Sequence, residues 1–434
     1  MTPREPLLES GEGAPIRLPD GGLTPLERML DRGRLRALLT MLGPAFVAAV
    51  AYVDPGNFAT NVQGGAKYGY QLMWVVLVAN LIAMLVQYLS AKLGIVSGRS
   101  LPEVCRGYLP RWSTWGLWIQ AEIMAMATDV AEFLGAAIGL NLLFGVPLLV
   151  AGLITGVIAF AILELQRRGY RGFELAIAGL LGIVLLGFLY ETLKIGPSAP
   201  DALRGLIPHL GGGNAAYLAV GIVGATVMPH VIYLHSALTK SRVEMRNDAE
   251  RRRVLRYQRV DVIVALSLAG LINLAMLAVA AKLLHVPGLT GVDTIQGAHA
   301  QFSHLVGGGA ALAFAVALLA SGSSSSSVGT FAGQVVMSGF IGVQIPLLVR
   351  RTVTMLPALI ILALGVSTTG ALVLSQVVLS FGIPFAVIPL VLLTNRPEVM
   401  GNFANGRLLK FAAFAVAGAI TAMNVFLIAQ QFLG

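Results

Sequence analysis

Apolar stretches long enough to cross a bilayer recur along the whole chain, and this repetition limits the folds that are open to it. A helix of about 20 residues spans the hydrocarbon core, because each residue adds about 1.5 Å. The mean hydropathy is +0.79, and 12% of the residues are charged, against about 25% in soluble domains. The composition excludes a soluble enzyme, a nucleic-acid-binding domain and a receptor with a single anchor. We therefore predict an all-α polytopic membrane protein.

The charged residues predict how these helices are oriented. Eleven spans are predicted, at residues 42–66, 70–96, 114–139, 146–165, 171–192, 215–238, 260–283, 308–338, 352–368, 370–394 and 408–431. Of the 30 Lys and Arg, Lys67, Lys194, Arg204 and Lys282 fall on one side, which leaves 26 on the side of the N-terminus. This positive-inside bias predicts a multi-pass protein of the cell (plasma or inner) membrane, with a cytoplasmic N-terminus and an external C-terminus.

Two of the predicted spans contain a proline beside polar residues near their middle. The first span contains the sequence DPGN at 54–57, and the sixth contains MPH at 228–230. Proline removes a backbone donor and clashes with the preceding turn, so both helices should be interrupted. Breaks five spans apart, in helices that cross in opposite directions, predict an inverted five-plus-five repeat with a substrate site at the midplane. The alternative is two unrelated proline kinks, which would not require the adjoining Asp, Asn and Met.

This repeat divides the chain into five parts. We predict a cytoplasmic tail at 1–41, a first repeat at 42–192, an external loop at 193–214, a second inverted repeat at 215–394, and a cytoplasmic loop with the eleventh helix at 395–434. The tail is polar and rich in Pro and Gly, and it lacks the pattern of a cleavable signal. Residues 240–259 predict a basic cytoplasmic helix near anionic headgroups.

The broken helices offer ligands for a metal ion. Asp54 would be a carboxylate at the bilayer centre, and Asn57 adds a neutral oxygen on nearly the same helical face. The unwound segment exposes backbone carbonyls such as that of Ala51. Met228 adds a thioether, which contributes nothing to Ca²⁺ or Mg²⁺ binding but is accepted by softer divalent ions such as Mn²⁺ and Fe²⁺. The pattern favours a transition-metal site; the alternative for Met228 is packing in the core.

These motifs resemble those of the Nramp family of divalent metal transporters. The resemblance rests on DPGN, MPH and the segment GTFAGQVVMSGF at 329–340, and it extends from residue 36 to residue 431. It implies an all-α, LeuT-type fold with helices 1 and 6 broken, and import of Mn²⁺ or Fe²⁺ with protons. The ligands that it implies are Asp54, Asn57, Met228, the carbonyls of Ala51 and Ala225, and Gln376 once the site closes. The serine run Ser323–Ser327 departs from the family pattern and leaves the role of the eighth span open.

A second set of polar residues lies in the third predicted span. Glu122, Asp129 and Glu132 are spaced seven and three residues apart, so they share one face of a helix. Three acids in one span should face the bundle interior or water rather than lipid. The candidate proton relay from the midplane to the cytoplasm consists of these acids with His230, Arg350 and Arg351. The alternative is an internal ion-pair network that holds the helices together.

Four further polar residues fall inside predicted spans. His235, soon after His230, is expected to line a cytoplasmic vestibule. For Asn80, Asn273 and Thr226 we expect hydrogen bonds within the core.

No motif indicates another kind of chemistry. The lone Cys105 excludes an intramolecular disulfide, and no Cys/His cluster predicts zinc. No phosphate-binding loop or hydrolase motif is present, so we predict neither an ATPase subunit nor an enzyme, and no cofactor beyond the transported metal and protons. The predicted partners are divalent metal ions, protons and the lipid bilayer. The alternative function is a cation-coupled symporter of amino acids or organic solutes with the same fold, which would bind a carboxylate at bare helix ends.

Overall fold

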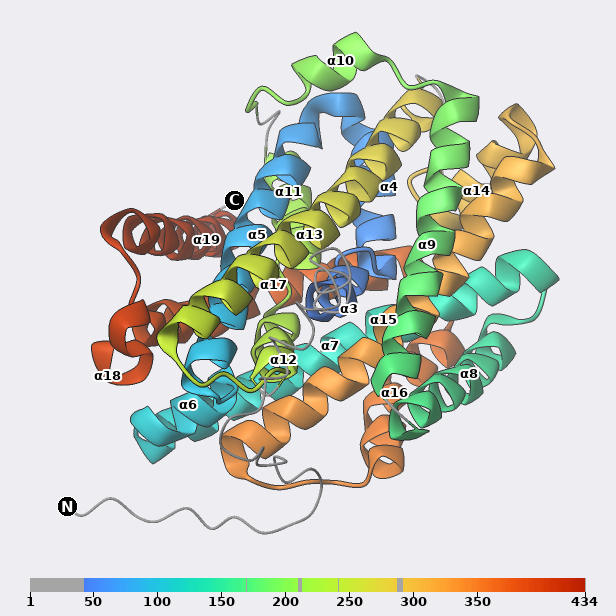
Figure 1. Cartoon of the computed structure of the whole chain (residues 1–434). Coiled ribbons are helices and arrows are strands. Elements are labelled where there is room, and N and C mark those ends of the chain that lie inside the picture. The colour runs from blue at the N-terminus through green and yellow to red at the C-terminus, as the bar shows by residue number, and fades with distance from the viewer. Residues whose placement is uncertain (1–42, 169, 210–212, 241, 287–291, 434) are drawn as a thin grey trace, which may run out of the picture.

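The computed structural model describes residues 43–433 except 169, 210–212, 241 and 287–291, and all the regular structure in them is helical (Figure 1). The α-helices are α3 (Pro44–Ala51), α4 (Pro55–Tyr68), α5 (Met73–Ser97), α6 (Leu101–Tyr108), α7 (Arg111–Phe144), α8 (Leu148–Arg168), α9 (Tyr170–Ile195), α10 (Ala199–Arg204), α11 (Gly213–Thr226), α12 (Pro229–Thr239), α13 (Asp248–Leu284), α14 (Ile295–Leu305), α15 (Gly308–Ile341), α16 (Leu347–Leu364), α17 (Thr368–Thr394), α18 (Pro397–Met400) and α19 (Arg407–Leu433). Two 3₁₀ turns, η1 (Gly69–Leu72) and η2 (Gly401–Phe403), join α4 to α5 and follow α18.

The two predicted helix breaks are confirmed. The first span divides into α3 and α4, and the sixth divides into α11 and α12. Pro55 and Pro229 each begin the second half of their span, at the first helical position, where a missing N–H costs no helix hydrogen bond. In Figure 1, α3, α4 and α12 lie in the middle of the bundle, surrounded by longer helices.

Length and hydropathy support fewer spans than the eleven that we predict. Among the described residues, eight helical stretches are long and apolar enough to cross a membrane, and Leu148–Ala161 is a shorter apolar helix. The eleven-span layout and its division into five parts therefore remain predictions.

The helix at the predicted ninth span ends four residues before the approximate end that we predict. Helix α16 stops at Leu364 rather than at residue 368, because Gly365 follows it with φ 66°, a left-handed conformation that terminates helices. Ser367 then caps the next helix, since its side chain accepts the Gly370 N–H.

The predicted basic helix at 240–259 is wrong in its extent. The Asn247 side chain accepts the Glu250 N–H at 2.9 Å and caps α13, which therefore begins at Asp248 and continues as one helix to Leu284. The basic residues between 251 and 259 thus lie in the first turns of a long helix and do not form a separate segment.

The centre of the bundle depends on close contact between α7 and α15. Small residues allow the two backbones to approach: a Cβ at Gly322 would lie 2.6 Å from the Ala136 backbone nitrogen, and one at Gly139 would lie 2.9 Å from Leu319. Helices that lack a hydrophobic driving force between them associate in lipid through such small residues. All of Ser323–Ser327 is buried in this part of α15.

Four buried phenylalanines join α4, α9, α14 and α15 beside the first helix break. Phe58 packs edge-on against Phe188 and Phe314, with ring centroids 5.2 and 5.7 Å apart, and Phe314 packs against Phe302 at 5.0 Å. Each is at most 2% exposed. Since Phe58 follows Asn57 directly, this aromatic cluster fixes the helix that carries a candidate ligand.

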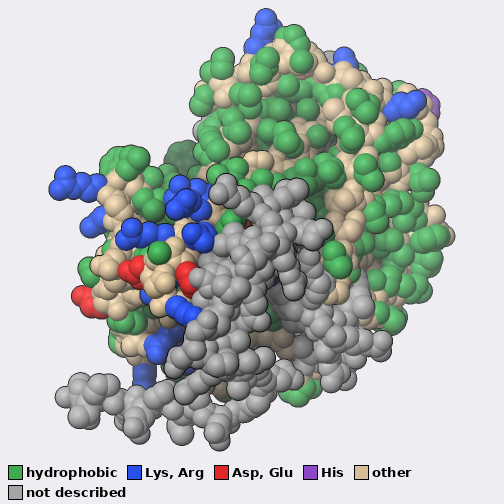
Figure 2. Space-filling model, viewed as in Figure 1, with side chains coloured by type: hydrophobic (Ala, Val, Ile, Leu, Met, Phe, Trp, Pro, Cys, Tyr) green, Lys and Arg blue, Asp and Glu red, His purple; other side chains and the backbone are tan. Residues whose placement is uncertain are grey.

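The surface of the molecule has a charged end and an apolar side. Figure 2 shows Lys and Arg side chains gathered over α6, α18 and the beginnings of α13 and α19, whereas apolar side chains are abundant in the upper and right parts of that view. We call this end the basic face; its exposed residues include Arg106, Arg253, Arg396 and Arg407. The predicted clustering of positive charge on one side is consistent with this arrangement.

Candidate metal site and polar path

The candidate metal site lies where the first helix is interrupted. Asp54 caps the N-terminus of α4: its Oδ1 accepts the Asn57 backbone N–H at 2.8 Å and the Asn57 Nδ2 at 2.7 Å. The side chain is fully buried, and within the described part of the chain its Oδ2 has no hydrogen-bond partner. Because an unpaired buried carboxylate oxygen is costly, this atom is suited to a cation.

Proline frees one carbonyl at each break. A helical carbonyl accepts the N–H four residues later, and that position is Pro55 for Ala51 and Pro229 for Ala225. The Ala225 carbonyl instead accepts Asn57 Nδ2 at 3.0 Å, which links the two broken helices directly. This proline spacing is a signal that identifies Ala225 from the sequence without any family resemblance.

Side chains of other helices satisfy the neighbouring carbonyls of the first break. Asn273 Nδ2 donates to the Tyr52 carbonyl at 2.7 Å, and Ser321 Oγ donates to the Val53 carbonyl at 2.6 Å. Thr226 Oγ1 donates to the carbonyl four residues before it, at 2.7 Å. The expected core hydrogen bonds are thus confirmed for Asn273 and Thr226.

Two further predicted ligands, Met228 and Gln376, are buried around this centre. Met228 precedes Pro229 at the start of α12 and is fully buried. Gln376, on α17, packs so closely over Gly56 that a side chain at Gly56 would overlap it. In the described residues the Gln376 Oε1 has no hydrogen-bond partner. Two side-chain oxygens without partners, on Asp54 and Gln376, therefore adjoin the break in the first helix.

The donor set is mixed rather than a cluster of one kind. The part of the chain that the structure describes contains no group of three or more His, Cys, Asp or Glu side chains that could hold a metal ion. A site at the breaks would instead combine one carboxylate, amide oxygens, backbone carbonyls and a thioether. Such a combination suits a borderline divalent metal better than zinc or calcium.

The expectation for His235 is wrong. Its side chain is fully buried rather than open to a vestibule in the part of the chain that the structure describes: Nδ1 pairs with Gln87 Oε1 at 2.8 Å, and Nε2 lies 3.3 Å from Gln258 Nε2. Gln87 in turn donates to the Tyr52 hydroxyl at 2.6 Å. Helices α5, α12 and α13 surround the ring, and no local pattern in the sequence indicates this enclosure. Asn80 also differs from expectation, since within the described residues its Oδ1 has no hydrogen-bond partner.

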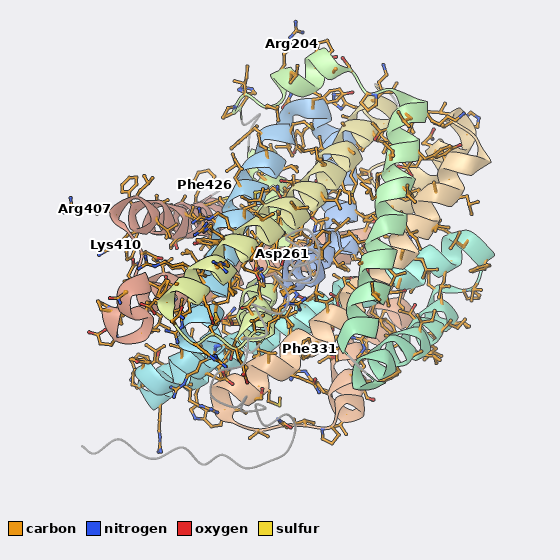
Figure 3. All side chains as sticks on the ribbon, in the orientation of Figure 1. Arg204, Asp261, Phe331, Arg407, Lys410 and Phe426 are labelled. Carbon is orange, nitrogen blue, oxygen red and sulfur yellow. The ribbon has the colours of Figure 1, made fainter. Side chains whose placement is uncertain are left out.

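The same chain of hydrogen bonds reaches an acid that the sequence analysis did not single out. Gln258 donates to Asp261 Oδ2 at 3.0 Å, and the Asp261 carboxylate accepts the backbone N–H groups of Gly43 and Ala45 at 3.3 and 2.9 Å. Figure 3 shows Asp261 near α3 in the centre of the view. Asp261 thus holds the first turn of α3 from a helix more than 200 residues away in sequence.

Acids of α7 form ion pairs with the two arginines of α16. Arg350 binds Glu122 through two hydrogen bonds, of 2.6 and 3.1 Å, and Arg351 binds Asp129 at 3.0 Å. The Arg351 side chain is fully buried and also donates to Thr330 Oγ1 at 2.9 Å and to Ser326 Oγ. The serine run therefore contains a hydroxyl that holds a buried arginine, a role that the sequence analysis left open.

The remaining members of the predicted path lack these ion pairs. Both carboxylate oxygens of Glu132 are buried and, among the described residues, without a hydrogen-bond partner. His230 Nδ1 pairs with Thr128 Oγ1 at 3.2 Å, next to Asp129 in sequence, while its Nε2 has no partner in this part of the chain. Glu191 on α9 is another fully buried acid without a partner in these residues, and the sequence analysis did not identify it.

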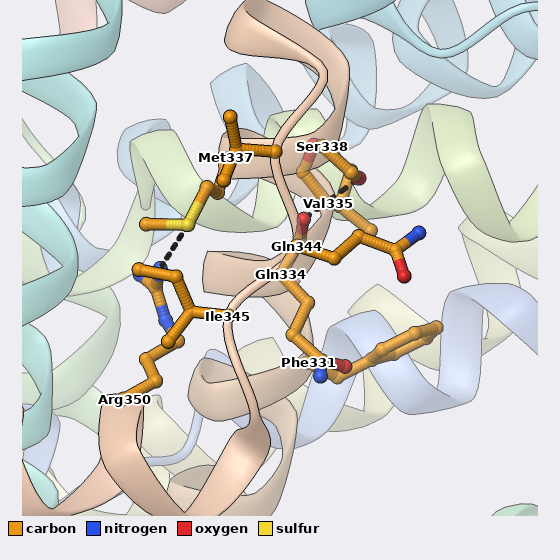
Figure 4. Close-up of a pocket in the computed structure, with 9 residues that line it drawn as sticks. Phe331, Gln334, Val335, Met337, Ser338, Gln344, Ile345 and Arg350 are labelled. Carbon is orange, nitrogen blue, oxygen red and sulfur yellow. Dashed lines mark hydrogen bonds between the residues drawn. The ribbon is translucent and has the colours of Figure 1, made fainter.

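A small cavity adjoins the ion pair of Arg350 at the end of α15 (Figure 4). Its volume is about 240 Å³, and Arg350, Gln334, Gln344 and Ser338 supply polar groups to its wall. Arg350 Nη1 also contacts the Met337 sulfur at 4.0 Å. Arg106, on the basic face, donates to the Ser338 carbonyl at 3.2 Å, so the cavity lies beside that face.

Comparison with known proteins agrees with this arrangement of broken helices and mixed donors. The family profile described as natural resistance-associated macrophage protein-like matches residues 45–430. The chain belongs to the Nramp family. It is 52% identical over 398 residues to the divalent metal cation transporter MntH of Bacillus subtilis, covering 92% of this chain and 93% of the relative. It is 49% identical over 423 residues to MntH of Deinococcus radiodurans, covering 95% and 97%.

Solved structures of other transporters share the fold. The manganese transporter of Eremococcus coleocola, solved with an aromatic bis-isothiourea compound, has a TM-score of 0.84 and 33% identity, covering 93% of this chain and 89% of that one. MHP1, a nucleobase-cation-symport-1 family transporter, is 15% identical with a TM-score of 0.59, covering 90% and 91%, which shows the fold alone. The predicted all-α inverted-repeat fold with broken helices is thereby confirmed, in a multi-pass membrane protein.

Proposed function

We propose that this chain imports divalent transition metal ions, Mn²⁺ and Fe²⁺, together with protons, by alternating access across the plasma or inner membrane. One observation carries the metal site: the buried Asp54 Oδ2 has no partner among the described residues, between two helix breaks whose prolines free the Ala51 and Ala225 carbonyls. Relatives named as divalent metal cation transporters and a manganese transporter of the same fold support this substrate class. They give no support to an amino-acid symporter.

The metal would bind to Asp54, Asn57, Met228, Ala51 and Ala225. Asn57 Nδ2 now donates to both Asp54 and the Ala225 carbonyl, so the amide must turn for its Oδ1 to reach a cation. That turn would release the carboxylate and the carbonyl together as oxygen ligands. Met228 then selects against Ca²⁺ and Mg²⁺, since a thioether does not replace the water that these hard ions prefer.

The candidate metal site is closed to both sides of the membrane in this conformation, as expected for a transporter that opens to one side at a time. Asp54, Asn57, Met228 and Gln376 are at most 1% exposed, so the ion would be enclosed in this conformation. The aromatic cluster around Phe58 lies on one side of the site. On the other side the chain of hydrogen bonds through His235 and Asp261 holds α3. We propose that release of metal into the cell requires α3 to leave Asp261.

Protons would follow α7 to the basic face. From the metal site the path would pass His230 and Glu132, then the ion pairs of Asp129 and Glu122, and end at the cavity of Figure 4. The two ion pairs also hold α7 to α16, as expected for an internal ion-pair network, so in this proposal the same groups carry protons and hold the helices together. The basic face would be cytoplasmic, which places the N-terminus inside and the C-terminus outside.

Metal uptake into proteoliposomes, with internal pH recorded at the same time, tests this function. We expect Mn²⁺ to enter and the interior to acidify, with Ca²⁺ and Mg²⁺ excluded. Asp54→Ala should abolish uptake and leave the melting temperature within a few degrees, because it removes the one acidic ligand without breaking a helix. Near wild-type uptake in that variant would place the metal site elsewhere. Mn²⁺ uptake without acidification would contradict proton coupling but not metal transport.

A further inference from the structure

An apolar groove opens on the side of the molecule, apart from the candidate metal site. The start of α7, the second half of α17 and the second half of α19 form it, and its volume of about 560 Å³ lies within the range of about 300–1,000 Å³ that ligand pockets have. Phe385, Ile388, Leu392 and Val425 line it with side chains that are between 41% and 59% exposed. These side chains face outward on a membrane protein, so a lipid chain can reach them.

Two polar side chains that line the groove, Asn424 and Thr421, already have hydrogen-bond partners within the protein. Pro384 has no N–H to donate to the Ser380 carbonyl, and Asn424 Nδ2 donates to that carbonyl instead, at 2.7 Å. Ser380 Oγ donates back to Asn424 Oδ1 at 3.0 Å. Asn424 therefore holds α19 to α17 with its side chain engaged inside the protein, and the mostly apolar lining favours an apolar chain along the groove.

One end of the groove is positively charged. Arg396 lines that end and is exposed. Arg111 does not line the groove, but it is exposed at the start of α7, two residues from each of the lining residues Leu109 and Ser113. Within the described residues neither arginine has an ion-pair or side-chain hydrogen-bond partner, and the nearby Glu398 makes no ion pair with Arg396 there. Figure 3 shows Arg407 and Lys410 together at one end of α19, the end that belongs to the basic face.

We propose that this groove binds an anionic phospholipid, with one acyl chain against α17 and α19 and the phosphate at Arg396 and Arg111. The apolar wall cannot discriminate between lipids, because their tails are equally apolar. Selectivity must come from the charged end, where each Lys or Arg near the surface favours an anionic headgroup about fivefold. A second copy of the chain fits less well, since a two-fold contact through this groove would bring like-charged arginines together.

Lipid retention by the purified full chain, measured by native mass spectrometry, tests the proposal. With phosphatidylglycerol and phosphatidylcholine of identical acyl chains in equal amounts, we expect phosphatidylglycerol to be retained about tenfold more. The double change Arg111→Gln and Arg396→Gln should reduce this preference to near one. The matched change Arg253→Gln and Arg256→Gln, at exposed arginines of α13 outside the groove, should leave it unchanged. Equal retention of the two lipids by the unaltered chain would overturn the proposal.

The apolar wall is tested separately. Ile388→Trp fills the groove and should lower retention of both lipids severalfold, whereas Ile360→Trp, at an exposed position on α16 outside the groove, should not. Raising the salt concentration should reduce the preference of the unaltered chain, which requires no variant to fold. Retention that is insensitive to salt and to both Ile388→Trp and the double arginine change contradicts a site here. A dimer that Ile388→Trp dissociates would assign the groove to a second copy instead.

Discussion

The two oxygens of Asp54 have different surroundings, and this difference makes one residue both a structural cap and a candidate ligand. Oδ1 receives two hydrogen bonds from Asn57, which fix the rotamer and begin α4. Oδ2 has no hydrogen-bond partner among the described residues. The backbone N–H of Asn57 can keep the carboxylate in place when a cation arrives, so it is partly preorganised and only the Asn57 amide has to turn.

Met228→Ala should change selectivity more than affinity. Replacing the thioether by water makes the ligand shell entirely hard, so Ca²⁺ and Mg²⁺ should compete severalfold better, and Cd²⁺, the softest candidate, should lose most. Competition against Mn²⁺ uptake in proteoliposomes measures this. Met355→Ala, at a buried methionine of α16, is the control and should leave the ratios unchanged. The same Ca²⁺ to Cd²⁺ preference in both variants would show that Met228 only packs.

Asp129→Asn, combined with a second change, distinguishes a role of Asp129 in proton transfer from a role in holding α7 to α16. Alone, it leaves Arg351 buried without a counter-ion, so the melting temperature should fall, and metal-driven acidification should fall about tenfold or more. Adding Arg351→Gln removes the buried charge and should recover the melting temperature. Acidification should stay low if Asp129 carries protons. Recovery of acidification together with stability would instead assign the pair a structural role.

At the scale of the helix, the serine run makes α15 a hydroxyl-bearing partner for α7 and α16. A run of serines has modest helix propensity, but here the hydroxyls are buried and most donate to carbonyls of their own helix, for example Ser324 to Ala320 at 2.7 Å. Ser326 differs, because its hydroxyl contacts Arg351, and Ser321, just before the run, donates to a carbonyl of the first helix break. The helix thereby contacts both the metal site and the polar path.

Thr330→Val should destabilise α15 against α16. Valine keeps the shape but removes the hydroxyl that accepts a hydrogen bond from the buried Arg351, at a cost of about 1–3 kcal/mol. Thr155→Val is the control, because that buried hydroxyl bonds only to the Ala151 carbonyl of its own helix. Thermal unfolding should show the larger loss for Thr330→Val. Equal losses would mean that the bond to Arg351 contributes little.

At the scale of the whole molecule, the two halves of the chain are joined at the basic face. Helix α6 follows the second span and α12 ends the sixth, yet Lys240 Nζ binds Glu103 at 2.7 Å and the Leu101 N–H donates to Ser236 Oγ at 2.8 Å. Glu103 also completes a capping box at Ser100. Burial raises the pKa of the Glu103 carboxyl, but the hydrogen bonds and charge of Lys240 and the Ser100 N–H outweigh it, so the pKa lies below its usual range.

This lowered pKa predicts a pH-dependent contribution to stability. A carboxyl whose pKa is lower in the folded state stabilises it above the unfolded pKa, and the contribution disappears as the pH falls through the folded value. Glu103→Gln should therefore cost about 1 kcal/mol at neutral pH, and the difference from the unaltered chain should vanish in acid. Asp201→Asn, at a mostly exposed ion pair, should have a smaller effect. A difference that persists at low pH would show that Glu103 acts through packing instead.

Features that depend on neighbouring residues can be predicted from the sequence. Apolar length predicts the helices, and a proline four residues after Ala51 and another after Ala225 decide where two of them break, because a missing N–H acts within one turn. Ion pairs and hydrogen bonds between distant segments are set by the tertiary structure. It paired Glu122 with Arg350 and Asp129 with Arg351, enclosed His235 against the expectation, placed Asp261 at the start of α3, and gave Ser326 its arginine. Those partners lie on other helices. Their sequence positions do not show which polar groups will meet, because the distances between them are set only when the helices pack in the folded bundle.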